Sequence, residues 1–320
     1  MGTRKPLTGC LPAFGRHQGY PPRYGWLRKT YLALREDPGC LRQLDNAMMI
    51  LGVGSSMVKS MRFWIQAFGL ASPADGGLVP TARGHWLLDD EQGADPFLEE
   101  PASLYLLHWW LLSAAQCHVP SWRYLFGHTA LRSYSRSTLQ QMITGIADST
   151  GWKAPAPSVV ARDIACMVGM YAPSHPDQPL ERVEDALFNP FRSLRMLTTS
   201  GAPEDSRDRT HTVTISRMAG QTCPAAVLAY ASLDYAARTA GPGPGSIAVA
   251  RLASVPDGPG RLLLTDTPGL LRALRSTGRR HEGLAVTESA GEALLAYSVP
   301  PAALAKKVLA STFPRAGASW

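Results

Sequence analysis

The sequence predicts a mainly helical α+β fold in which a winged helix-turn-helix is elaborated by a helical bundle and followed by a second α+β domain. Three observations support this prediction. Apolar residues recur at helical spacing on both sides of a glycine turn at 52–54. A hairpin pattern follows at 69–80. The second half alternates short helices and strands, which is typical of another, degenerate winged-helix-like unit.

The segment 14–26 precedes the first predicted helix. It is rich in glycine and proline, yet it also carries one phenylalanine, two tyrosines and a tryptophan. Disordered arms contain few aromatic residues, so we expect this segment to be ordered against the body of the protein. A helix is predicted from about 27 to 35, and Asp37-Pro38-Gly39 forms the turn that follows it.

Two helices around the glycine turn form the predicted helix-turn-helix. The first has an apolar stripe at four positions: Leu41, Leu44, Met48 and Leu51. The second, for which Ser55 offers an N-cap, has an apolar face at five positions: Met57, Val58, Met61, Ile65 and Phe68. The opposite face of the second helix is polar and cationic at steps of four, three and four residues: Ser55, Lys59, Arg62 and Gln66.

The predicted wing and a closing helix complete this unit. Strand-like residues at 69–71 and 78–80 flank a turn-rich segment, and the helix at 81–88 begins with a threonine cap. A cationic face on the second of two such helices can lie in the major groove of DNA. We therefore expect DNA contacts from six residues, with the last acting as a phosphate clamp: Arg16, Ser55, Lys59, Arg62, Gln66 and Arg83. Winged helices also bind proteins, and this alternative stays open.

The helical bundle is predicted from three further segments, at 102–115, 121–126 and 137–147. The first is apolar on most sides, so it is expected to be buried, with His108 as a hydrogen-bonded core histidine. Glycine and prolines at 150–157 mark a boundary, which divides the chain into domains 1–150 and 151–320. In the second domain the pattern predicts helices and strands in this order: helix 159–171, strand 211–215, helix 225–238, strand 261–265, helix 268–276 and strand 284–287.

Composition bounds the class of protein. The 320 residues carry a formal charge of +7, which suits a polyanionic partner. The five cysteines are scattered without a C-x-x-C pair, so neither a disulfide framework nor a structural zinc site is indicated. No signal-peptide pattern or membrane-length apolar run is present. We therefore expect a soluble, cytoplasmic protein that has no contact with the membrane.

The G-x-S-x-G, H-E-x-x-H and Walker patterns are absent from the sequence. The segment 14–26 is therefore the first candidate for a catalytic site. His17 can act as a general acid or base, Arg23 can stabilise charge on a phosphate, and Tyr24 can orient a water or act as nucleophile. Together they could form a metal-independent phosphodiesterase site. The alternative is that His17 and Arg23 pin the segment or hold a backbone phosphate.

An acidic cluster at 89–100 offers a second possibility for the chemistry. Its carboxylates could hold a divalent metal such as Mg²⁺ or Mn²⁺, as metal-dependent nucleases require. An acidic loop is more often exposed to solvent, so no metal ligands are assigned and the cofactor stays open.

Several motifs resemble a known family. They are the segments 14–17, 22–27, 51–54 and 95–99 with 104–109, and, more weakly in the second half, Arg162-Asp163, 190–197 and 259–261. These motifs are similar to those of the domain-of-unknown-function family 4007. That family resembles, or includes, the B component of Ssp-type DNA phosphorothioation systems, in which sulfur replaces a non-bridging phosphate oxygen.

The resemblance implies a function and partners, but it does not assign the catalytic residues. It implies nicking of double-stranded DNA beside a cysteine desulfurase, an ATPase and a reductase-like enzyme, in modification and antiviral defence. A non-catalytic DNA-binding or scaffold subunit is the alternative, and a transcriptional regulator is a third. Two departures from the family pattern stand out: Arg16 occupies the place where glycine is expected before the motif histidine, and Ser55-Ser56 occupy the place where relatives tend to have a lysine.

Overall fold

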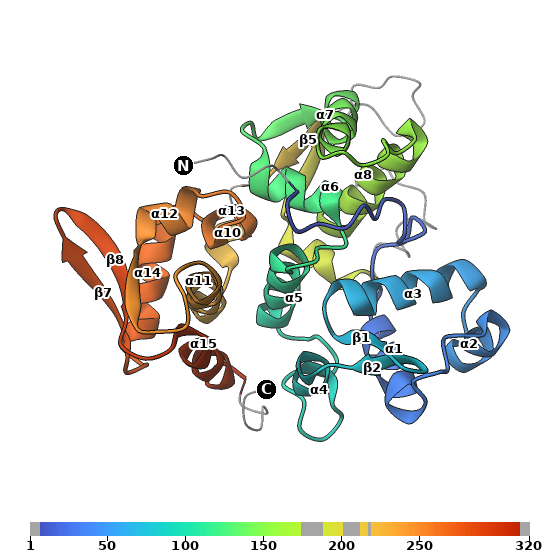
Figure 1. Ribbon diagram of the computed structural model, residues 1–320, viewed down its shortest axis with the longest axis horizontal. Helices are drawn as coiled ribbons and strands as arrows, with labels where there is room; N and C mark the ends of the chain where they lie inside the picture. Colours follow the sequence, from blue (N-terminus) through green and yellow to red (C-terminus); the bar gives the residue numbers. More distant parts are fainter. Residues whose placement is uncertain (1–6, 174–187, 201–211, 217–218, 314–320) are drawn as a thin grey trace.

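A computed structural model describes residues 7–173, 188–200, 212–216 and 219–313. The fold is α+β and mainly helical, with three groups of elements around the central helix α5, Pro101–Ser113. Figure 1 shows the N-terminal unit at the lower right, a middle unit at the top and a C-terminal unit at the left. Among the described residues, no helix has the length and apolarity needed to cross a membrane.

The N-terminal unit has the helices and the hairpin that the spacing predicts, with two differences in their bounds. In chain order the elements are α1 (Trp26–Glu36), α2 (Leu44–Leu51), α3 (Ser55–Ala67), β1 (Ala71–Ala74), β2 (Gly77–Pro80) and α4 (Ala82–Leu88). Leu41 precedes α2, and β1 covers residues 71–74 although a strand was expected at 69–71. The strands form an antiparallel hairpin in which Ala71 pairs with Pro80. The predicted threonine cap is confirmed, since the Thr81 side chain accepts a hydrogen bond from the amide of Gly84. Gly54, and not Ser55, is the N-cap of α3, so Ser55 is its first helical residue.

The middle unit combines helices with a three-stranded sheet. Its elements are α6 (Pro120–Arg123), the π-helix η1 (Tyr124–His128), β3 (Ser133–Ser135), α7 (Arg136–Ser149), α8 (Pro157–Tyr171), the 3-10 helix η2 (Pro190–Leu194), β4 (Leu197–Ser200) and β5 (Thr212–Ile215). The sheet is antiparallel in the order β3-β5-β4. Strand β3 lies before the predicted boundary at 150–157 and its partner β5 lies after it. That boundary therefore falls inside this unit. Of the strand predicted at 211–215, residue 211 lies outside the described residues.

The C-terminal unit packs helices against a second three-stranded sheet. Its elements are α10 (Ala219–Thr222), α11 (Ala225–Thr239), β6 (Gly245–Ala248), α12 (Val249–Ser254), α13 (Pro259–Leu262), α14 (Thr267–Gly278), β7 (Leu284–Ser289), β8 (Glu292–Tyr297) and α15 (Pro301–Ala310). The sheet is antiparallel in the order β6-β8-β7. Helix α11 packs on α14 and α15.

One predicted strand in this unit is wrong. Residues 261–265 do not form a strand, because Gly258 caps the short helix α13 and Pro259 occupies its first turn. Leu262 and Leu263 are buried at the end of this helix. A short apolar run fits a strand and a buried helical turn equally well, which is why periodicity alone did not separate them.

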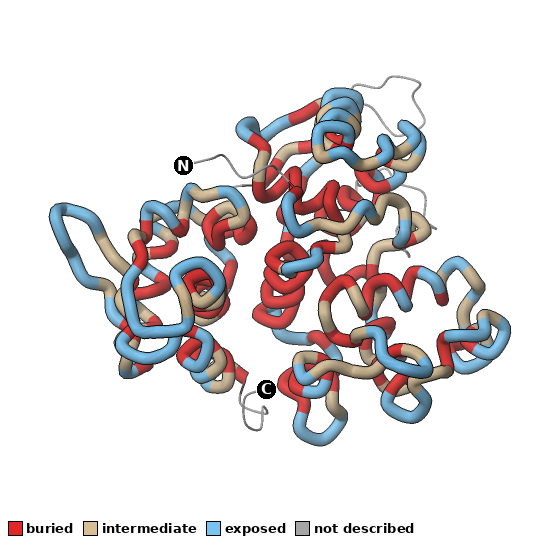
Figure 2. Tube along the Cα trace, in the orientation of Figure 1, coloured by how far each residue is buried: buried red, intermediate tan, exposed pale blue. Residues whose placement is uncertain are grey.

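Helix α5 is the core around which the three units pack. Figure 2 shows it buried along its length, as its apolar residues on every side predict. The core interpretation of His108 is confirmed: its Nδ1 lies 2.7 Å from the Tyr171 hydroxyl and its Nε2 lies 2.8 Å from the Leu262 carbonyl oxygen. Burial lowers the pKa of His108 to about 4. The imidazole therefore joins α5 to α8 and α13 in its neutral form.

Candidate functional site

Helix α3 exposes the cationic stripe that its spacing predicts. Lys59 and Arg62 are exposed, while Ser55 and Gln66 are half-buried at the two ends of the stripe. The Gln66 amide donates a 2.7 Å hydrogen bond back to the Arg62 carbonyl oxygen, so part of its capacity is used within the helix. The structure thus brings Lys59 and Arg62 together on one exposed face.

The other side of α3 is fixed by the N-terminal segment. The Ser60 hydroxyl and the Trp64 indole both donate to the carbonyl oxygen of Tyr20, at 3.2 and 2.9 Å. Val58, Met61 and the Trp64 ring are buried behind them. Because this side is held by packing and hydrogen bonds, the position of the cationic stripe is set by rigid structure.

The two remaining predicted DNA contacts lie in different surroundings. Arg16 is exposed in the N-terminal segment. Arg83 is half-buried, and its guanidinium lies over the Trp110 ring at 5.1 Å from the centroid. One face of the Arg83 guanidinium is thus covered by a residue of α5. This position does not favour the predicted role of Arg83 as a phosphate clamp.

His17 lies in the interior. Its side chain is 2 % exposed, and its ring is 5.4 Å from that of Trp122 and stacked on Trp64. Nδ1 accepts a 3.0 Å hydrogen bond from the Gly19 amide, so Nε2 is the nitrogen that donates to Asp163, at 2.9 Å. Both ring nitrogens are therefore used within the protein. This is the geometry of the pinning alternative.

Asp163, on α8, is the acceptor that holds the N-terminal segment in place. It is 1 % exposed. Besides His17, it accepts hydrogen bonds from the Gly15 amide and the Ser121 hydroxyl, each at 2.7 Å. One buried carboxylate thus joins the segment to α6 and α8. Asp163 lies 146 residues from His17 in the sequence, so local spacing does not predict this contact.

Arg23 and Tyr24 lie nearer the surface than His17. The Arg23 guanidinium lies 5.8 Å from the Tyr20 ring centroid and 5.6 Å from that of Trp26. Tyr24 is 49 % exposed, and its amide donates to the Phe188 carbonyl oxygen at 2.6 Å. The predicted trio is thus divided, with one member in the core and two at the surface.

Two carboxylates of the acidic cluster at 89–100 accept hydrogen bonds that stabilise the local fold. Asp95 is buried and accepts hydrogen bonds from the Glu99 and Glu100 amides and from the Ser103 hydroxyl. Asp89 accepts from two amides and from the Tyr31 hydroxyl, and backbone hydrogen bonds hold its pKa below the usual range. Within the described ranges, no three His, Cys, Asp or Glu side chains converge as metal ligands.

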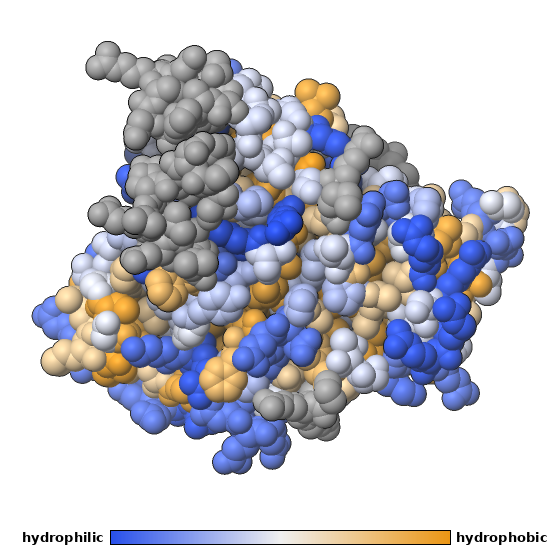
Figure 3. Space-filling model, turned by 180° about the vertical axis from the view of Figure 1, so that it is seen from behind, coloured by the Kyte–Doolittle hydropathy of each residue, from blue (hydrophilic) through white to orange (hydrophobic). Residues whose placement is uncertain are grey.

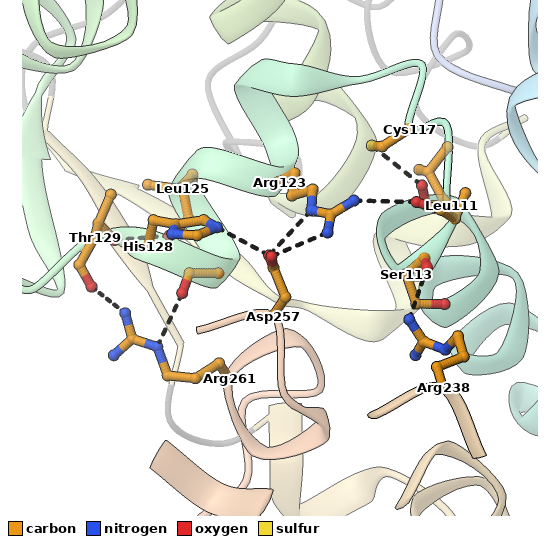
Figure 4. Close-up of polar contacts among 12 residues, drawn as sticks. Leu111, Ser113, Cys117, Arg123, Leu125, His128, Thr129, Arg238, Asp257 and Arg261 are labelled. Atoms are coloured by element: carbon orange, nitrogen blue, oxygen red, sulfur yellow. Dashed lines mark hydrogen bonds and ion pairs between the residues drawn. The ribbon is translucent and has the colours of Figure 1, made fainter. Parts of the chain in front are cut away.

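A second polar centre, which the sequence did not indicate, joins the middle and C-terminal units. Asp257 accepts 3.0 Å hydrogen bonds from Nε and Nη2 of Arg123 and from Nε2 of His128, as Figure 4 shows. Burial opposes ionisation of Asp257, but the bonds from His128 and Arg123 outweigh it and hold its pKa at about 2. Beside it, Arg261 donates to the carbonyl oxygens of Gly127 and Thr129.

A cavity of about 710 Å³ opens next to this centre. It lies between the two units, since its lining includes residues of η1, the end of β5, α13 and the start of α14. Three arginines contribute to the lining: Arg132, Arg261 and Arg272. Its charge suits an anionic ligand better than a neutral one.

Comparisons with known proteins give the family. The model of the family described as a protein of unknown function, DUF4007, matches residues 14–313. The chain belongs to the DUF4007 family. No curated protein matches it. The resemblance that the motifs at 14–27 and 51–54 indicated is thereby confirmed.

Two solved structures are similar to this DUF4007 chain over nearly its whole length. One is a crystal structure of SspB, with a TM-score of 0.88 and 33 % identity, covering 98 % of this chain and 91 % of that chain. The other is a crystal structure of magnesium ion-bound SspB, with a TM-score of 0.86 and 33 % identity, covering 96 % and 89 %. The predicted mainly helical α+β class agrees with this match.

Proposed function

We propose that this protein binds duplex DNA in the cytoplasm and cuts one strand of it, as the SspB-like component of a DNA phosphorothioation system. The similarity to SspB in sequence and fold along nearly the whole chain carries the proposal. Its partners in this function are a cysteine desulfurase, an ATPase and a reductase-like enzyme that act on the same DNA. A nick gives these enzymes access to the backbone whose oxygen is exchanged for sulfur.

The N-terminal unit supports the DNA-binding part of the proposal. We interpret α2, α3 and the β1-β2 hairpin as a winged helix-turn-helix whose helix α3 enters the major groove. The exposed Lys59 and Arg62 point away from the side that Tyr20 and the core hold. Cations fixed in this way can neutralise phosphates or bind the edges of guanine bases.

Replacing Lys59 and Arg62 together by alanine is expected to weaken DNA binding at least tenfold. The slope of log affinity against log salt should fall by about 2, because two phosphate contacts are lost. Fluorescence anisotropy of a labelled duplex over a salt series measures both quantities. The matched control is Lys153→Ala with Lys307→Ala, which removes two exposed cations elsewhere. Equal losses in the two variants would contradict a specific role for α3.

We place DNA cleavage at the surface part of the N-terminal segment. Arg23 supplies positive charge to the scissile phosphate, and the Tyr24 hydroxyl orients the attacking group. His17 acts as a positioning residue, since both of its ring nitrogens hold the segment against α8. The 49 % exposure of Tyr24 and the aromatic support of Arg23 favour these two over His17 as groups that touch DNA. We assign no residue to a divalent cation.

Replacing Tyr24 by phenylalanine is expected to slow nicking by about 100-fold, because it removes the hydroxyl that orients the attacking group. Losses of this size follow when a general acid–base group is removed. Duplex affinity should stay within twofold, because the ring and its packing remain. Conversion of supercoiled plasmid to open circle, with and without Mg²⁺ or Mn²⁺, is the measurement. Tyr20→Phe, in the same segment, is the control.

The plasmid experiment also separates the second candidate function. A non-catalytic DNA-binding or scaffold subunit is favoured by the internal use of His17, Asp89 and Asp95. If the wild-type protein binds duplex but produces no open circle with any metal, the scaffold function holds. If the Tyr24→Phe variant nicks as fast as the wild type, cleavage lies elsewhere in the chain.

A further inference from the structure

Helix α14 is buried along one side and exposed along the other. Four residues of its inner side are buried: Leu270, Ala273, Leu274 and Thr277. They face α11, α12 and β7, which are the elements that α14 contacts. The Asp266 side chain caps the helix by accepting a 2.9 Å hydrogen bond from the Gly269 amide. The direction of the helix is therefore set by packing, while its outer side is free to bind.

The outer side carries a stripe of arginines. Arg272, Arg275 and Arg279 are exposed and follow one another at steps of three and four residues, which places them on one face. Arg275 lies 3.5 Å from Glu288, but both side chains are more than half exposed, so this pair is weak in water. Arg272 and Arg279 pair with no carboxylate among the described residues. Such like charges repel one another unless an anionic partner is bound.

The topology around α14 follows the order of a winged helix, a unit that commonly binds DNA. Strand β6 leads into α12, and α14 comes directly before the β7-β8 hairpin, with all three strands in one antiparallel sheet. The sheet beside α14 has three strands, whereas the sheet of the N-terminal unit has only β1 and β2. The C-terminal unit is therefore the more complete winged-helix arrangement of the two. A helix so placed presents its outer face to the major groove.

The dimensions and surroundings of the stripe fit duplex DNA. From Arg272 to Arg279, which is the C-cap residue of α14, the chain rises about 10 Å, which spans about three base pairs along the groove. Arg272 also lines the 710 Å³ cavity, where Arg132 and Arg261 add charge of the same sign. Figure 3 shows strongly hydrophilic side chains over the C-terminal unit, at the right in that view. The hairpin carries Glu288 and Glu292, so contact falls to the helix and not to the hairpin.

We propose that α14 is a second DNA-binding helix, which inserts Arg272, Arg275 and Arg279 into the major groove of the duplex that α3 also contacts. The inference deepens the proposed function and rests on its DNA-binding part, not on the cleavage step. Arginine forks bind guanine bidentately, so α14 favours sites with guanine in the groove.

The test compares two variants with the same loss of charge. Arg272→Gln with Arg279→Gln removes the two arginines that have no described carboxylate partner, and Lys153→Gln with Lys307→Gln removes two exposed lysines elsewhere. All four side chains are exposed, so thermal unfolding should match that of the wild type. Anisotropy of a labelled 30-base-pair duplex is then measured over a salt series.

The α14 variant is expected to lose at least tenfold in affinity for a duplex with guanine in the groove, together with its preference for such sites. The lysine variant should stay within twofold. Equal losses in both variants would show general attraction by net charge and overturn the role of α14. If the Lys59 and Arg62 variant loses affinity while the α14 variant keeps it, only this inference fails. A wild-type protein that binds no duplex would overturn the proposed function as well.

Discussion

Replacing Asp257 by alanine is expected to lower the free energy of unfolding by about 3 to 5 kcal/mol. The reason is the arginine that the variant leaves behind. Arg123 is 5 % exposed, and two of its hydrogen bonds go to Asp257. After the change it retains the bond from Nη1 to the Ala114 carbonyl oxygen, while a buried charge has lost its partner. Removing one member of a buried ion pair is costly for this reason.

The experiment is urea unfolding followed by circular dichroism. Asp266→Ala, which removes an exposed helix cap in the same unit, serves as the control and should cost about 1 kcal/mol. Since the pKa of Asp257 is about 2, below its ordinary value of 3.8, its stabilising effect is complete above about pH 4 and is lost as the pH falls through 2. A loss below 1 kcal/mol for Asp257→Ala at neutral pH would contradict the structural role.

Replacing Asp163 by alanine is expected to cost about 3 to 4 kcal/mol and to release the N-terminal segment. The change leaves three donors without an acceptor: the part-buried Gly15 amide and the buried His17 Nε2 and Ser121 hydroxyl. Segment 14–24 should become sensitive to limited proteolysis before the rest of the chain unfolds.

Asp148→Ala, at an exposed position on α7, is the control for Asp163. It should change neither the unfolding midpoint nor the proteolysis pattern. If the Asp163 variant is cleaved in the segment no faster than this control, the segment is held by packing and not by the carboxylate. That outcome would also remove the support for His17 as a positioning residue.

Local spacing predicted the helices and the α3 stripe, because both depend on residues close together in the sequence. Local spacing singled out His17 as a residue of interest but did not identify its partner. Asp163 lies on α8, in the second half of the chain, and only the fold brings it to His17. The stripe at Arg272, Arg275 and Arg279 follows the same steps as that of α3, so spacing could have found it. The Asp257 centre could not be found in this way, because its three members come from two units.

Strand β3 shows where sequence patterns reach their limit. It has three residues, too few for alternation to be recognised, and it pairs across 81 residues when Ser133 meets Thr214. For the same reason the division predicted at 150–157 passes through the middle unit. The proline and glycine there connect α7 to α8, which pack against each other.

The position of β3 also determines when the protein can fold during synthesis. The partner strand emerges from the ribosome about 80 residues later, so the buried ring of Tyr134 stays without its neighbour Val213 until then. Helix α5 is apolar on every side, and two of the helices that cover it, α11 and α13, are also synthesised later. The nascent chain therefore exposes its future core through much of translation, and this exposed apolar surface is a site where aggregation can begin.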